Sequence, residues 1–165
     1  LTRAAAFFQQ RGITPMILGD SVTGEAREVA KVYAALARQI KRYHHPLKPP
    51  VVMISGGECT VTMRNPGKGR GGRCSEFLLS LAIDLDSQEN IFAVACDTDG
   101  IDGSEENAGA FLEPASLQRA HSIGVNAKSQ LAANDAFGFF APLDDLIITG
   151  PTRTNVNDFR AILIL

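Results

Sequence analysis

Three separated segments of the chain concentrate residue types that bind polar and anionic ligands. They are SGGECTVTMRNPGKGRGGRCSE at 55–76, CDTDGIDG at 96–103 and TGPTRTNVND at 149–158. Each lies beside a short apolar run with the composition of a strand. Loops at strand ends commonly form the ligand sites of α/β proteins. The sequence therefore predicts that these loops together hold a polar, anionic ligand.

The glycine-rich part of the first segment, PGKGRGGR at 66–73, is suited to an anion. Its glycines allow close approach of the backbone, and the helix predicted to follow would add the positive potential of its N-terminus. The order of residues fits neither a GxxxxGK[ST] phosphate loop nor a strand-linked dinucleotide fingerprint. The alternative is a solvated hairpin tip. The residues expected to contact the anion are Lys68, Arg70, Gly71, Gly72 and Arg73.

The second segment places two carboxylates, Asp97 and Asp99, directly after an apolar run, with Thr98 between them. Carboxylates in this position can bind Mg²⁺ through one or two oxygens, or accept a proton from a substrate. The alternative is a series of turns in which aspartate side chains bond to nearby backbone N–H groups. Asp97 and Asp99 are therefore candidates for catalysis and for metal binding, and Thr98 for substrate binding.

The third segment combines hydroxyl and amide side chains with an arginine, which suits ligands with many oxygens, such as a sugar acid or a phosphate. Its alternative is a capped turn. The end of the apolar run at 51–54 adds further polar residues at another strand end. The candidate ligand-binding residues in these two places are Ser55, Gly56, Gly57, Glu58, Thr152, Thr154, Asn155 and Asn157.

The composition limits the class of protein. The chain has 165 residues, 45% of them hydrophobic, and a formal net charge of −2, which indicates a globular domain and disfavours general binding to nucleic acid or acidic membranes. No apolar run is long enough to span a membrane. The odd number of cysteines, with no CxxC, predicts a reducing, cytoplasmic compartment. Cys59 and Cys96 are expected in the core, whereas Cys74, close to arginines, is expected to be more exposed with a lowered pKa.

Apolar periodicity predicts intermixed strands and helices, and so an α/β fold with a mixed, largely parallel sheet flanked by helices. The chain opens in what reads as the end of a helix, so we expect it to be part of something longer. The run at 51–54 is expected to break at Gly56-Gly57 and to pair like a hairpin with 59–63. Strands are predicted at 13–20, 51–54, 59–63, 91–96, 146–149 and 159–164, and helices at 23–42 with Thr23 as the N-cap, 76–85, 114–124 and 127–133.

The quoted segments, with SGGECTVT, GKGRGGRCSEFLLSLA, ACDTDGIDGSEENAGA and TGPTRTNVNDFRAILI in this order, resemble the MOFRL domain, the C-terminal domain of the type II glycerate kinases. The resemblance covers 51–165, and residues 1–50 resemble the segment that leads into that domain. It implies phosphorylation of D-glycerate to 2-phosphoglycerate with ATP and Mg²⁺. It also implies a second, N-terminal nucleotide-binding domain, absent here, so that this chain carries half of an interdomain active site.

The resemblance also implies roles for single residues. Arg73 matches the arginine of the family's GGR-N-Q-E pattern that faces the cleft, but Cys74 and Ser75 stand where the family usually has Asn and Gln. We expect Arg73, with Lys68 and Arg70, to neutralise the substrate carboxylate or the moving phosphoryl group. Asp97 or Asp99 would bind Mg²⁺ or accept the hydroxyl proton. Residues orienting the substrate would be Thr154, Asn155 and Asn157.

Two other functions remain open at this point. Many members of the family carry hydroxypyruvate reductase names, by association with tartrate or glyoxylate pathways, which would require NAD(P)H. The missing strand-linked GxGxxG motif argues against that chemistry. The other alternative is a non-catalytic domain that binds a small acid, or that regulates or dimerises its neighbour. A homodimer is compatible with either.

Overall fold

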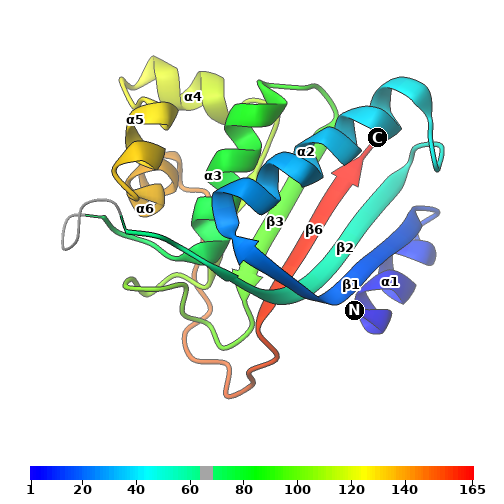
Figure 1. Ribbon diagram of the computed structural model, residues 1–165, viewed down its shortest axis with the longest axis horizontal. Coiled ribbons are helices and arrows are strands. Elements are labelled where there is room, and N and C mark those ends of the chain that lie inside the picture. Colours follow the sequence, from blue (N-terminus) through cyan, green and yellow to red (C-terminus); the bar gives the residue numbers. More distant parts are fainter. Residues whose placement is uncertain (64–68) are drawn as a thin grey trace.

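The computed structural model describes residues 1–63 and 69–165, and in them a six-stranded sheet of order β1-β2-β6-β3-β4-β5 with helices on both faces (Figure 1). The strands are β1 Thr14–Glu25, β2 Val51–Thr60, β3 Ile91–Asp97, β4 Gly109–Leu112, β5 Leu146–Ile147 and β6 Asp158–Ile164. The helices are α1 Thr2–Gln9, α2 Ala26–Tyr43, α3 Arg73–Leu85, α4 Ser116–Ser122, α5 Ala127–Ala132 and α6 Ala136–Phe140, with the 3₁₀ turn η1 Ala141–Leu143.

The predicted α/β class and the mixed sheet are confirmed, but the prediction that the sheet is largely parallel is wrong. Of the adjacent strand pairs described, β1–β2 is parallel and all the others are antiparallel. The reason is that β6 inserts between β2 and β3 and runs opposite to both. The short strand β4, a Gly-Ala-Phe-Leu run with little periodicity, was not predicted.

The expected break at Gly56-Gly57 is also wrong. β2 continues through both glycines to Thr60, with β1 on one side and β6 on the other, so 59–63 forms no hairpin with 51–54. Gly57 has φ 118°, and a Cβ there would lie 2.2 Å from the carbonyl oxygen of Val22. The register of β1 shifts just before Val22. Glycine therefore permits a close strand approach at a bulge instead of ending the strand.

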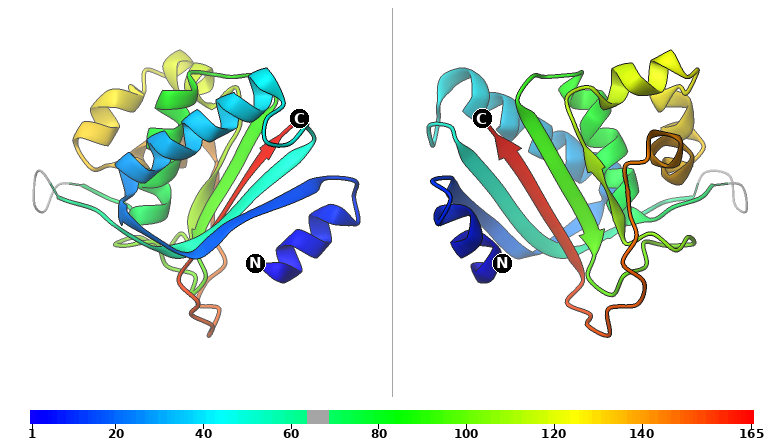
Figure 2. Two further views of the ribbon diagram at one scale, coloured as in Figure 1. Left: turned by 45° about the vertical axis from the view of Figure 1, so that its right-hand side comes forward. Right: turned by 180° about the vertical axis from the view of Figure 1, so that it is seen from behind.

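The two faces of the sheet are covered unequally. α2 and α3 pack on one face and α1 on the other, as the views in Figure 2 show. Alternation along β2 separates the two layers, because Val51 and Met53 join the core under α2 and α3 whereas Val52 and Ile54 face α1. Residues 14–25 are extended, so α2 begins at Ala26 and not after Thr23. α3 begins at Arg73, three residues before the predicted start.

A buried ion pair joins α2 to α3. Oε1 of Glu76 accepts a hydrogen bond from Arg27 Nε at 2.9 Å and lies 2.8 Å from Arg27 Nη2, and Oε2 accepts a hydrogen bond from Asn134 Nδ2 at 2.8 Å. The side chains of Arg27 and Glu76 are almost completely buried. A second set of bonds, from Thr62 to the Glu25 carboxylate, holds the end of the β2 segment against the start of α2. The helix layer is thus tied to the segment on either side of the glycine-rich loop.

No helix in the described ranges is long and apolar enough to cross a membrane.

Substitution of Glu76 by alanine is expected to lower the free energy of unfolding by about 3–5 kcal/mol, because the buried Arg27 loses its close counterion and keeps only Glu25, at 3.9 Å. Glu28→Ala is the matched control: Glu28 forms an exposed pair with Lys31, and its loss should cost less than about 0.5 kcal/mol. Urea denaturation followed by circular dichroism measures both. Equal losses for the two variants would contradict a stabilising role for the buried pair.

Candidate anion-binding site at Arg73

Arg73, the first residue of α3, is surrounded by three carboxylates. Its Nε donates to Asp158 Oδ1 at 2.6 Å, its Nη2 to Asp97 Oδ2 at 2.6 Å, and its Nη1 lies 3.3 Å from Glu58 Oε1. The sheet register explains the meeting, because Asp158 of β6 is aligned with Gly57 of β2 and with Asp97 of β3. Three strand ends therefore present polar residues in one row, next to the N-terminus of α3.

Behind this row lies a second guanidinium. Arg160 Nη2 donates to Asp158 Oδ2, and the backbone N–H of Cys59 donates to the same oxygen at 3.3 Å. Arg160 is fully buried and its guanidinium lies 5.2 Å from the ring centroid of Phe77. Neither Asp158 nor Arg160 was predicted as a site residue. The signal was there, because an arginine inside the apolar run FRAILI has to find a buried counterion.

The electrostatics follow from this arrangement. Burial alone would lower the pKa of Arg73, but the hydrogen bond and charge of Asp158, together with the charge of Asp97, raise the pKa above its ordinary value. Burial raises the pKa of Asp97, and the backbone N–H of Asp99 and the Arg73 charge offset this only in part. Arg73 is therefore a permanent cation. The cluster of Glu58, Arg73, Asp97, Asp158 and Arg160 has three carboxylates and two guanidinium groups, a formal excess of one negative charge.

Asp102 holds the helix end that carries Arg73. Its Oδ1 accepts the N–H of Cys74 at 2.9 Å and its Oδ2 accepts the N–H of Ser75 at 2.8 Å, so a fully buried carboxylate caps α3 from a loop outside the helix. A Cβ at Gly72 would lie 2.3 Å from Asp102 Oδ1 and 2.4 Å from its backbone carbon. Glycine at 72 therefore lets the two loops touch. The sequence placed Asp102 in a polar segment but gave no sign of this partner.

Hydrogen bonds join the loop after β3 to the loop before β6. Thr98 donates both its N–H, at 3.1 Å, and its hydroxyl, at 2.7 Å, to the carbonyl oxygen of Asn157. The Thr152 hydroxyl donates to the Thr98 carbonyl, and the Thr152 N–H to the Asp99 carbonyl at 3.0 Å. In Figure 1 these two loops hang side by side from one end of the sheet. The predicted second and third polar segments thus meet.

The other predicted ligand-binding residues lie either in an exposed loop or in the core. Asn155 accepts the N–H of Asn157 through Oδ1 at 3.0 Å, and the Thr154 N–H bonds to the Thr152 hydroxyl at 3.3 Å, so this loop is organised by local turns and is exposed. Ser55 is fully buried within β2.

The glycine-rich loop before Arg73 is partly described. Arg70 does not join Arg73: its Nη2 lies 3.3 Å from Asp135, and its guanidinium lies 5.0 Å from the Phe137 ring centroid. Gly71 and Gly72 connect this loop to α3. Lys68 lies outside the described residues.

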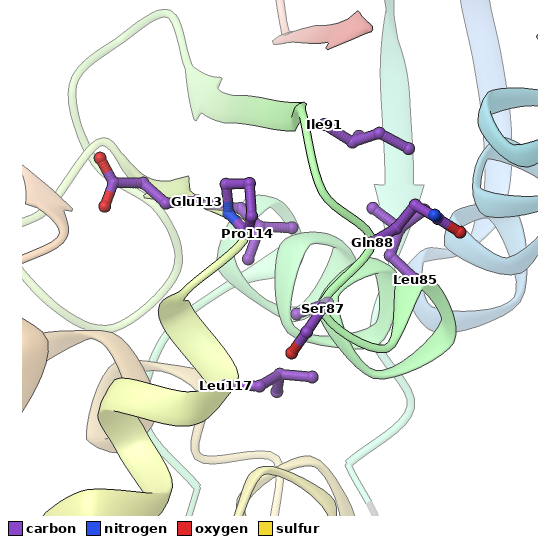
Figure 3. Close-up of a pocket in the computed structure, with 9 residues that line it drawn as sticks. Leu85, Ser87, Gln88, Ile91, Glu113, Pro114 and Leu117 are labelled. Carbon is purple, nitrogen blue, oxygen red and sulfur yellow. The ribbon is translucent and has the colours of Figure 1, made fainter. Parts of the chain in front are cut away.

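An open pocket of about 580 Å³ adjoins the cluster, lined by Arg73, Glu58, Gly71 and Gly72 together with Glu76 and Asn134. A second, of about 660 Å³, lies across the β2 end and includes Gly56, Thr98 and Asp158. Figure 3 shows a third cavity, at the far end of α3 between Leu85, Ile91 and Leu117. Its volume, about 10 Å³, is close to that of one water molecule, so it is too small for a substrate.

The expectation for Cys74 is wrong. Cys74 is fully buried, and burial raises the pKa of its thiol well above the ordinary value, because the side chain points into the core beneath α3. The arginines that suggested a reactive thiolate are turned to other partners. Cys59 is buried as predicted, whereas Cys96 is only partly buried, and burial raises its pKa to about 11.

The donor set of this chain does not by itself fit a magnesium ion. Asp97 Oδ2 is bonded to Arg73 and Asp97 Oδ1 accepts the N–H of Asp99 at 3.2 Å, while Asp99 Oδ1 accepts the N–H of Ile101 at 2.9 Å. Among residues 1–63 and 69–165, no three His, Cys, Asp or Glu side chains are grouped to hold a metal. A magnesium ion that arrives with a nucleotide takes oxygens from the phosphates and waters.

Known proteins that are similar to this chain in sequence and fold include glycerate kinases. A protein of Agrobacterium vitis that carries the name of a hydroxypyruvate reductase is 51% identical over 99% of this chain. The D-glycerate 2-kinase of Thermotoga maritima is 34% identical over 98% of it. The crystal structure of a Thermotoga maritima glycerate kinase matches 99% of the chain with a TM-score of 0.94 at 34% identity.

This chain spans only about two fifths of these relatives: 43% and 38% of the two sequences and 39% of the crystallised chain. Residues 51–158 match the MOFRL family. The family resemblance predicted from the polar motifs is therefore confirmed, and the chain belongs to the MOFRL family.

Proposed function

We propose that this chain forms the C-terminal part of an ATP-dependent glycerate kinase that phosphorylates D-glycerate to 2-phosphoglycerate. The observation that carries the proposal is Arg73, held at a pocket edge by ion pairs from two strand ends. The kinase names of relatives and the fold shared with a glycerate kinase support it. The chain would supply one half of an interdomain site, and the rest of the protein, an N-terminal domain, would bind most of the ATP. A cytoplasmic location and a homodimer stay predictions.

The chemistry assigned to this half is electrostatic. Phosphoryl transfer passes through a loose transition state, in which positioning and neutralisation of charge supply most of the rate. Arg73 would face either the substrate carboxylate or the moving phosphoryl group. The two short bonds of Arg73, to Asp97 and Asp158, use only part of its N–H donors, so the edge of the guanidinium that faces Glu58 and the pocket can serve a ligand.

Of the two candidate aspartates, Asp97 is better suited to positioning. It is buried, and both of its oxygens already accept hydrogen bonds. Asp99 is partly exposed, so Asp99 is the better candidate for the general base that accepts the proton of the substrate hydroxyl. Thr154, Asn155 and Asn157 would orient the substrate from the loop before β6. Thr98 and Thr152 would hold that loop in place.

Replacing Arg73 by alanine in the full-length protein is expected to lower kcat/KM for D-glycerate by about 100- to 1000-fold, the usual loss when a preorganised donor is removed. Phosphorus NMR of the reaction with ATP, Mg²⁺ and D-glycerate measures the product. Arg119→Ala, which removes an arginine paired with Asp145 away from the pocket, is the control and should keep its activity. A variant at Arg73 with the activity of the unmodified protein would contradict the assignment.

The same full-length protein also tests the alternative that it is a hydroxypyruvate reductase. Oxidation of NADH with hydroxypyruvate, without a phosphorylated product from D-glycerate, would overturn the proposal.

Asp158→Asn tests whether Arg73 must be held in place. Loss of the carboxylate charge leaves Arg160 buried beside a neutral partner and loosens Arg73, so kcat is expected to fall by about 10- to 100-fold, with a smaller change in KM. Asp145→Asn makes the same chemical change next to Arg119, whose side chain reaches solvent, and should leave kcat unchanged. Both are assayed at a temperature where circular dichroism shows them folded. A lowered melting temperature with a normal kcat would assign Asp158 to stability alone.

A further inference from the structure

The three carboxylates around Arg73 are not equivalent. Asp97 and Asp158 each have an oxygen 2.6 Å from a guanidinium nitrogen, and their side chains are 5% and 0% exposed. Glu58 lies farther, at 3.3 Å, and its side chain is 57% exposed. Asp97 and Asp158 are buried carboxylates, so breaking their pairs with Arg73 would leave charges in a medium that solvates them poorly. The exposed pair with Glu58 contributes no more than about 1 kcal/mol.

Additional bonds widen the difference. Asp97 also accepts the Asp99 N–H, and Asp158 also accepts from Arg160 and from the Cys59 N–H. Removal of either carboxylate would break several contacts. Glu58 and Arg73 both line the open pocket, and Glu58 is mostly exposed. Its carboxylate can therefore turn into solvent without breaking the contacts of Asp97 and Asp158.

The charge of Glu58 is expected to weaken the binding of an anion at Arg73. With Glu58 in place, the cluster already has one more carboxylate than guanidinium groups. A carboxylate or phosphate that approaches Arg73 from the pocket must compete with Glu58 for the same donor edge, and is repelled by the Glu58 charge while both are present. An anionic ligand can approach Arg73 closely once Glu58 has moved.

We infer that Glu58 is an exchangeable counterion of Arg73, which occupies the place of the substrate anion in the free protein and is displaced when that anion binds. This rests on the proposed function only in placing the anion of the substrate at Arg73. Asp97 and Asp158 fix the orientation of the guanidinium, and Glu58 sets how tightly it accepts a ligand. Glu58 is thus a determinant of affinity, a role distinct from direct contact with substrate.

The test is Glu58→Gln in the full-length protein, with binding of inorganic phosphate and of D-glycerate measured by calorimetry at fixed ionic strength. Removal of the competing charge is expected to tighten both by about 2- to 5-fold, the size of an exposed ion pair, and to lower KM for D-glycerate in parallel. Glu113→Gln is a matched control, because Glu113 is an exposed carboxylate 3.4 Å from Arg119, which also pairs with the mostly buried Asp145. It should leave binding unchanged.

The Arg73→Ala background shows whether the effect acts through Arg73. There, Glu58→Gln is expected to change phosphate affinity by less than about twofold, since the donor edge is gone. Equal or weaker binding by Glu58→Gln overturns the inference, as does a gain that persists without Arg73 or that Glu113→Gln reproduces. Phosphate binding is measured without turnover, so a protein that fails to phosphorylate D-glycerate refutes the proposed function while the binding data still decide the role of Glu58.

Discussion

One buried carboxylate, that of Asp158, lies between two guanidinium groups, and much of the structure is arranged around it. Arg160 is fully buried, so removing its partner would leave a charge in a medium that solvates it poorly. Asp158 can reach Arg160, Arg73 and the backbone of Cys59 together only because β6 lies between β2 and β3. The central position of β6 is thus the condition for the ion pairs of Asp158, and through them for the orientation of Arg73.

The parts of the site that the sequence predicted are those whose composition is unusual for a turn. The three polar segments could be recognised because strand ends rarely need so many glycines, threonines and aspartates. All three do meet, through the bonds of Arg73 to Asp97 and Asp158. The partners could not be predicted, because Asp102 reaches the α3 N-terminus across a long sequence separation. The same holds for Cys74, which sequence neighbours suggested was exposed and the core fully buries.

The two wrong predictions about the fold concern properties that depend on distant strands and not on neighbouring residues. Gly56-Gly57 reads as a break, since glycine usually interrupts a strand, but here a close approach of β1 requires it. Strand direction cannot be read from periodicity, so the helices between strands suggested a parallel sheet. The return of β6 into the middle of the sheet, which makes its pairs antiparallel, depends on long-range contacts that no local pattern encodes.

The place of β6 has a consequence for how the protein is made. β2 and β3 do not touch each other in the sheet; they are joined only through Asp158–Ile164, near the end of the described chain. During synthesis, each of these strands must therefore keep one backbone edge unpaired until residues 158–164 have left the ribosome. Sheet completion by a late central strand favours slow, nonlocal folding. A premature stop codon before residue 158 would thus yield two half-sheets prone to association with other chains, rather than a shortened but folded domain.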